Sequence, residues 1–78
     1  MKVVYTNKES GEVTGYELDI SEIEDHIEAR IIHQGMYPIT DSNESVTFEC
    51  KEFSVVYTPE NSTEEKVMDD TCIHLIGG

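Results

Sequence analysis

One run with helical periodicity lies among segments whose apolar residues alternate, and this arrangement restricts the chain to few folds. Isoleucines recur every four residues, which places them on one face of a helix, and they are Ile23, Ile27 and Ile31. Ser21 followed by Glu24 forms a capping-box pattern, and Gly35 suits the end of a helix. The pattern predicts a helix over residues 22–34.

The flanking segments show the period of two that is typical of half-buried strands. The alternating or β-rich segments are residues 3–5, 16–20, 46–50 and 53–57. A polar turn that contains Gly11 joins the first two predicted strands, and a tight turn near residues 51–52 joins the last two of these four. Residues 59–70 are polar and predict a loop with at most one helical turn, while the apolar residues 72–76 predict a last short strand.

This order of elements defines the expected fold class. With 78 residues the chain has about half the length of an average domain, so we expect a single domain over residues 1–78 with a thin core. The order strand, strand, helix and three further strands (ββαβββ) predicts an α+β protein. In it, one helix packs on a mainly antiparallel sheet of about four to five strands.

Acidic residues far outnumber basic ones, and this imbalance is the main indication of function. Seventeen Asp and Glu against five Lys and Arg give a formal charge of −12. Such a surface repels nucleic acid phosphates and anionic membranes and attracts cationic protein surfaces. We therefore expect neither direct nucleic acid binding nor membrane binding. Residues 1–7 lack the apolar core of a signal peptide, which predicts a cytoplasmic protein.

Motifs for catalysis, cofactors or metal ions are absent from the sequence. There is no Gly-rich phosphate loop and no G-x-S-x-G pattern. The three histidines and two cysteines lack the C-x-x-C or H-x-x-x-H spacing of a zinc site. Cys50 and Cys72 are predicted to be reduced, partly buried thiols rather than a disulfide. We expect a non-enzymatic protein with no catalytic residue, no cofactor and no metal site.

The acidic residues concentrate before and within the predicted helix, with no basic residue between Lys8 and Arg30. One interpretation is a solvated face, because acids are favoured in the first turn of a helix. The other is a surface that binds a cationic partner. We expect Glu17 and Asp19 to face outward from the second strand. Glu24 and Glu28 are expected to lie about 6 Å apart on the helix. The predicted partner-binding residues are Glu17, Asp19, Glu22, Glu24, Asp25 and Glu28.

In size and acidic composition, and in no motif, the chain resembles small phage-encoded inhibitor proteins, including anti-CRISPR and anti-restriction proteins that mimic nucleic acid. The resemblance implies an inhibitor that presents carboxylates in place of phosphates. Its partner is then the basic surface of a nucleic-acid-binding host protein or defence complex, met in the host cytoplasm. A homodimer through an unpaired sheet edge is a further expectation.

Two alternatives stay open. The hairpin, the helix and the later strands, followed by Leu75-Ile76-Gly77-Gly78, resemble ubiquitin-like β-grasp proteins. That resemblance implies a carrier or modifier that is activated at its terminal diglycine. The other alternative is a small regulatory interaction module.

Overall fold

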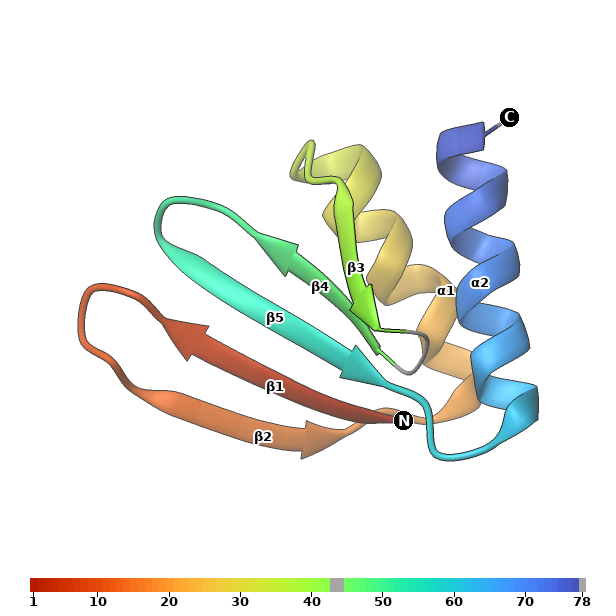
Figure 1. Cartoon of the computed structure of the whole chain (residues 1–78), viewed down its shortest axis with the longest axis horizontal. Helices are drawn as coiled ribbons and strands as arrows, with labels where there is room; N and C mark the ends of the chain where they lie inside the picture. The colour runs from red at the N-terminus through yellow and green to blue at the C-terminus, as the bar shows by residue number, and fades with distance from the viewer. Residues whose placement is uncertain (43–44, 78) are drawn as a thin grey trace.

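Within residues 1–42 and 45–77, which the computed structural model describes, five antiparallel strands form one sheet with both helices on the same face (Figure 1). The strand order is β2-β1-β5-β4-β3. The strands are β1 (Lys2–Asn7), β2 (Val13–Glu17), β3 (Pro38–Ser42), β4 (Ser45–Glu49) and β5 (Phe53–Thr58). The helical elements are α1 (Ile20–Glu28), its π-helical continuation η1 (Ala29–His33) and α2 (Ser62–Gly77). The α+β class predicted from the sequence is confirmed.

The first helix begins two residues earlier than predicted, because Asp19 and not Ser21 is its N-cap. The Asp19 carboxylate accepts hydrogen bonds from the Ser21 backbone N–H at 3.2 Å and from the Ser21 hydroxyl at 2.6 Å. A carboxylate there also interacts favourably with the positive end of the helix dipole. The isoleucine stripe faces the core as predicted, and Gly35 follows the helix with a left-handed φ of 65°.

The prediction of a loop over residues 59–70 and a strand over residues 72–76 is wrong, because α2 spans both segments. Asn61 precedes the helix, and its side-chain oxygen accepts the Glu64 backbone N–H at 2.9 Å. Met68, Thr71 and Leu75 then follow at helical spacing and pack toward the core. The leucine, isoleucine and glycine before Gly78 therefore form the last turn of a helix, and Gly78 itself lies outside the described residues.

The second strand also differs from its prediction. β2 ends at Glu17 and is exposed along its whole length, so the alternation over residues 16–20 does not mark a half-buried strand. Leu18 is buried after the strand ends, and Ile20 already belongs to α1. β3 was not among the strands predicted from the sequence. It follows η1, pairs with β4 and has a register shift between Ile39 and Ser42.

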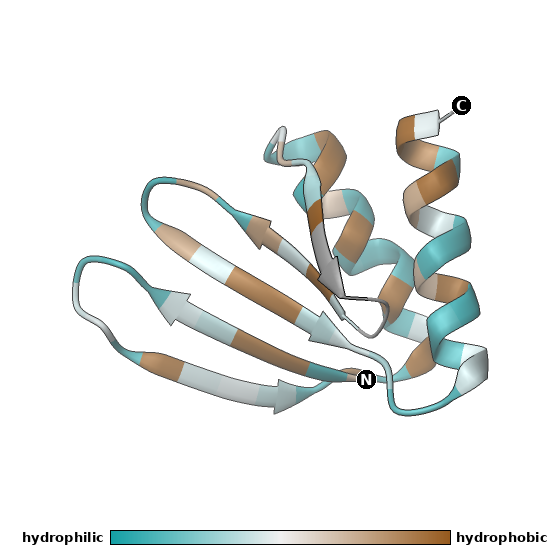
Figure 2. Ribbon diagram, viewed as in Figure 1, coloured by the Kyte–Doolittle hydropathy of each residue, from teal (hydrophilic) through white to brown (hydrophobic). Residues whose placement is uncertain are grey.

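The core lies between the sheet and the helices, and apolar segments alternate with polar ones along both layers (Figure 2). Alternate residues of the central strands point into it, and α1 and α2 cover them. Its fully buried side chains include Val3, Phe48, Val55, Tyr57, Ile23, Ile27 and Met68. None of the helices in the described part of the chain is long and apolar enough to cross a membrane.

Candidate functional site

Four of the six predicted carboxylates share the outward side of α1. At about 100° per residue, each lies about 60° or more from the centre of the buried isoleucine stripe. Three of the four residues are exposed, and Glu28 is half-buried. In the described part of the chain, no carboxylate of α1 forms an ion pair with a base. The four residues are Glu22, Glu24, Asp25 and Glu28.

Arg30 does not neutralise this acidic surface, because its guanidinium is held on the sheet side of the helix. Its Nε donates a hydrogen bond to the Tyr57 hydroxyl at 3.1 Å, and its Nη1 donates to Gln34 Oε1 at 2.8 Å. The guanidinium also lies over the Phe53 ring, 5.5 Å from the ring centroid.

The second helix adds carboxylates beside those of α1, because α1 and α2 lie side by side (Figure 1). A groove of about 250 Å³ between them is lined by Glu24 and Glu28 on one side and by Asp70 and His74 on the other, with Thr71 and Leu75 completing it. Lys66, the one basic residue of α2 apart from its histidine, pairs with Asp70 at 3.1 Å.

We refer to the outward carboxylates of both helices as the acidic helical face. Its members all lie on α1 or α2 and are exposed, apart from the half-buried Glu28. They are Glu22, Glu24, Asp25, Glu28, Glu65, Asp69 and Asp70.

Glu17 and Asp19 are not part of this face, and they do not face outward together from a strand. Asp19 caps α1, and the two hydrogen bonds from Ser21 lower the pKa of its carboxyl group below the usual value. Glu17 ends β2 and lies beside the N-terminus. The structure therefore separates the six predicted residues into a capping residue, a member of a second cluster and four residues of the acidic helical face.

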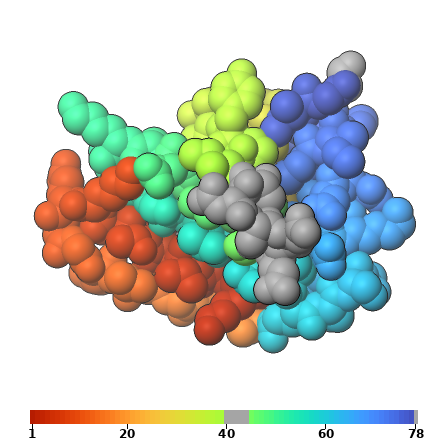
Figure 3. Space-filling view, in the orientation of Figure 1, coloured from red at the N-terminus to blue at the C-terminus, as the bar shows by residue number. Residues whose placement is uncertain are grey.

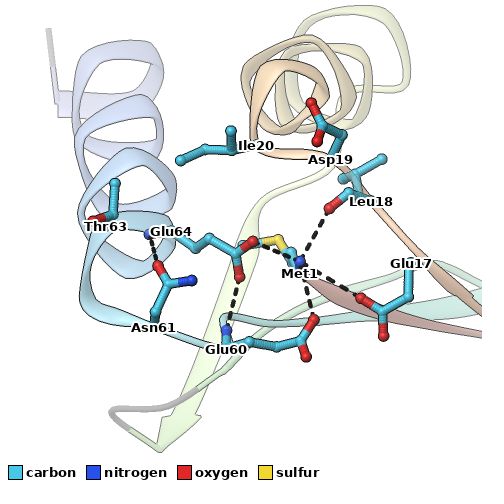
Figure 4. A pocket seen from close by; sticks show the side chains of 9 residues that line it. All are labelled: Met1, Glu17, Leu18, Asp19, Ile20, Glu60, Asn61, Thr63 and Glu64. Carbon is cyan, nitrogen blue, oxygen red and sulfur yellow. Dashed lines mark hydrogen bonds and ion pairs between the residues drawn. The ribbon is translucent and has the colours of Figure 1, made fainter.

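That second cluster surrounds the Met1 ammonium group (Figure 4). The Met1 nitrogen donates hydrogen bonds to the Leu18 carbonyl oxygen at 3.0 Å and to Glu64 Oε2 at 2.8 Å. Glu60 Oε1 lies 3.3 Å from the same nitrogen and Glu17 Oε2 lies 3.8 Å from it. Three carboxylates from β2, the β5–α2 connection and α2 thus meet one cation.

Burial and hydrogen bonding set the protonation of this N-terminal cluster. Burial opposes the charge on the Met1 ammonium, but hydrogen bonds from it to Glu64 and Glu60 outweigh burial and raise its pKa above 8.0. The same ammonium, followed by the Glu60 backbone N–H, lowers the pKa of Glu64. The carboxyl groups of Glu17 and Glu60 can share one proton, and this interaction raises the pKa of Glu17 and lowers that of Glu60. The cluster ties three elements of the fold together.

The cysteines form no disulfide and the histidines join no metal-binding group in residues 1–42 and 45–77. Both cysteines are free, and burial, followed by the charge of Asp69, raises the pKa of Cys72 to about 11. A thiol with that pKa is a poor nucleophile at neutral pH. Across the same residues, no group of three or more His, Cys, Asp and Glu side chains is placed to hold a metal ion.

The fold and the acidic helical face together define a small acidic α+β protein with one charged helical layer. Comparison with known proteins found no matching family model, no matching curated protein and no matching solved structure. The proposed function therefore depends on the geometry and charge of the chain itself.

The sequence patterns did not predict α2 or, with it, three of the seven carboxylates of the acidic helical face. One signal was available, because Asn61 followed by Glu64 is typical of a helix start. No local pattern indicated the N-terminal cluster, because Met1 and Glu64 are 63 positions apart and meet only when α2 packs against the start of β1.

Proposed function

We propose that this protein is a non-enzymatic binding protein that uses its acidic helical face to occupy the basic surface of a nucleic-acid-binding protein. In this role it inhibits that partner by standing in for the phosphates of DNA or RNA. Binding takes place in the cytoplasm, which is the host cytoplasm if the chain is phage-encoded.

The observation that carries the proposal is the density of unpaired charge on α1. Four carboxylates lie within residues 22–28, a stretch about 10.5 Å long at the rise of an α-helix. This is one negative charge per about 2.6 Å. Duplex DNA has one charge per about 1.7 Å of its axis, and each strand has one per about 3.4 Å. The linear charge density of α1 thus falls between the values for a single strand and a duplex.

The position of the charge also supports the proposal. Residues 19–34 and 60–70 carry ten acids and two bases, so they hold two thirds of the net charge of the chain. Within that set, Asp19, Glu60 and Glu64 make stabilising contacts, but the carboxylates of the acidic helical face repel one another, and among the described residues Lys66–Asp70 is the one ion pair that offsets this repulsion. A cationic partner would relieve this repulsion.

The test compares two double variants that change net charge equally, from −12 to −8. The first is Glu24→Lys with Glu28→Lys, in the groove between the helices. The control is Glu9→Lys with Glu12→Lys, two exposed residues of the β1–β2 turn. Each protein is immobilised and exposed to a bacterial lysate, and bound proteins are eluted with duplex DNA at constant ionic strength.

We expect proteins that bind the wild type and the control, are displaced by DNA, and bind the Glu24 and Glu28 variant at least tenfold more weakly. Binding should also weaken as salt rises, because charge pairing and steering are screened. Equal losses from both double variants would indicate nonspecific attraction to total charge. Binding that resists both DNA and salt would contradict the proposal.

A further inference from the structure

The fold holds Met1 on both sides, by its side chain and by its backbone nitrogen. Met1 is 2% exposed and belongs to the hydrophobic core. Its nitrogen donates to the Leu18 carbonyl oxygen at 3.0 Å and to Glu64 Oε2 at 2.8 Å. Its carbonyl oxygen accepts the Leu18 backbone N–H at 2.8 Å. The position of the amino group is therefore fixed before β1 begins at Lys2.

The charge of this amino group is balanced by the carboxylates of the N-terminal cluster. Oxygens of Glu64, Glu60 and Glu17 lie 2.8, 3.3 and 3.8 Å from the nitrogen. No other base forms an ion pair with these carboxylates in the described part of the chain. Without the ammonium charge, three negative groups would surround a neutral nitrogen, which opposes their ionisation.

There is room for a small group beside this nitrogen. A cleft of about 610 Å³, to which Met1 contributes, lies between the β2–α1 connection and the start of α2 (Figure 4). In the space-filling view, the first residues lie beside those near position 60 at the lower edge of the molecule (Figure 3). A small group on the nitrogen would therefore act mainly by changing its charge and not by a steric clash.

We propose that the α-amino group of Met1 is a modification site that controls the stability of the fold, because acylation removes the charge that the N-terminal cluster requires. The step is an acyl transfer from a thioester to the neutral amine. The N–C bond forms, the C–S bond breaks, and the amine proton leaves with the thiol. The product is an amide with one N–H donor and no positive charge.

The amide cannot replace the ammonium in this cluster. Its single N–H can donate to the Leu18 carbonyl oxygen or to Glu64, but the ammonium donates to both. One acceptor then loses its partner, and repulsion among the three carboxylates is no longer offset. The cluster attaches the start of α2 to the sheet, and α2 carries three of the seven carboxylates of the acidic helical face. Acylation therefore weakens the element that presents part of that face.

The experiment compares the chain with a free amino group and the same chain acetylated at Met1, both made by chemical synthesis so that the lysines stay unmodified. Thermal unfolding at pH 7 is followed by circular dichroism. We expect acetylation to lower the melting temperature by at least about 8 °C. A third chain carries one glycine before Met1, so its ammonium stays positive but lies about 3.8 Å further along the chain. Its melting temperature should fall less than half as far.

A double-mutant cycle assigns the effect to the contact with Glu64. In Glu64→Gln the charged partner is already lost, so acetylation should lower the melting temperature less than half as far as in the wild type. In Glu65→Gln, at an exposed residue of α2, acetylation should cost the same as in the wild type. Failure of the acetylated chain to fold, with the glycine-extended chain folded, would support the proposal. Equal melting of the free and acetylated chains, an undiminished effect in Glu64→Gln, or a glycine-extended chain as unstable as the acetylated one would overturn it.

Discussion

Replacing Glu64 with glutamine tests the N-terminal cluster. The side chain is 11% exposed and accepts two hydrogen bonds, from the Met1 ammonium at 2.8 Å and from the Glu60 backbone N–H at 2.8 Å. Glutamine has one acceptor oxygen, so keeping the Glu60 bond turns the amide NH₂ toward the ammonium. The variant therefore loses a bond between two charged groups, which contributes about 1.5–3 kcal/mol.

The expected loss in the free energy of unfolding is about 2 kcal/mol, because Glu60 and Glu17 still neutralise the ammonium from 3.3 and 3.8 Å. A domain of 78 residues has a total stability of about 4–12 kcal/mol, so the variant stays folded at 25 °C. Its melting temperature should fall by about 8–16 °C.

Thermal unfolding followed by circular dichroism at pH 7 measures this loss. Glu65→Gln is the matched control, because it makes the same chemical change at the next residue of α2, which is exposed. The control should change stability by less than about 0.5 kcal/mol. Equal melting temperatures for the two variants would refute the structural role of the Met1 contact.

Two further predictions follow from the same structure. The wild-type protein should lose stability as pH rises above 8.0, because the raised pKa of the Met1 ammonium contributes stability that is complete below 8.0 and lost as the folded group deprotonates. It should also lose stability as pH falls below 4.5, because the pKa of Glu64 is lowered in the folded state. Urea unfolding between pH 3 and 10 measures the loss of stability at both ends of the pH range. Ile27→Asp should unfold the protein, since Ile27 is fully buried and an unpaired charge there costs several kcal/mol. Ile32→Asp, at a residue 56% exposed on the same helical segment, should melt near the wild-type temperature in circular dichroism, and similar melting of both would contradict the assignment of the buried stripe.

The sequence predicted those elements whose stability comes from a clear local pattern. The isoleucine stripe identified α1, and the alternation over residues 46–50 and 53–57 identified β4 and β5. α2 was missed because Ile73 and Ile76 are apolar but exposed, so the helical periodicity is weak and a β-rich run is suggested instead. Packing against α1 and the sheet outweighs that local preference.

The candidate site was predictable only in part, for a related physical reason. A local concentration of acids identified the carboxylates of α1, but the same pattern included Glu17 and Asp19, which have structural roles. Sequence proximity does not separate a carboxylate that caps a helix from one that faces solvent. The distinction depends on where the strand ends and the helix begins: β2 ends at Glu17, and α1 begins at Ile20, so Asp19 lies at the N-cap.

The carboxylates of the N-terminal cluster and those of the acidic helical face differ in how far the fold neutralises them. Glu17, Glu60 and Glu64 surround a cation of the chain itself, so their charge is already partly neutralised within the fold. Among the described residues, the acidic helical face has one ion pair with a base, which joins Lys66 to Asp70. Reversing Glu60 or Glu64 would therefore remove a stabilising contact as well as a charge, and any effect on binding would mix unfolding with lost attraction. Changes at Glu24 and Glu28 alter the unneutralised charge and break no ion pair among the described residues, so they isolate the electrostatic contribution to the proposed partner binding.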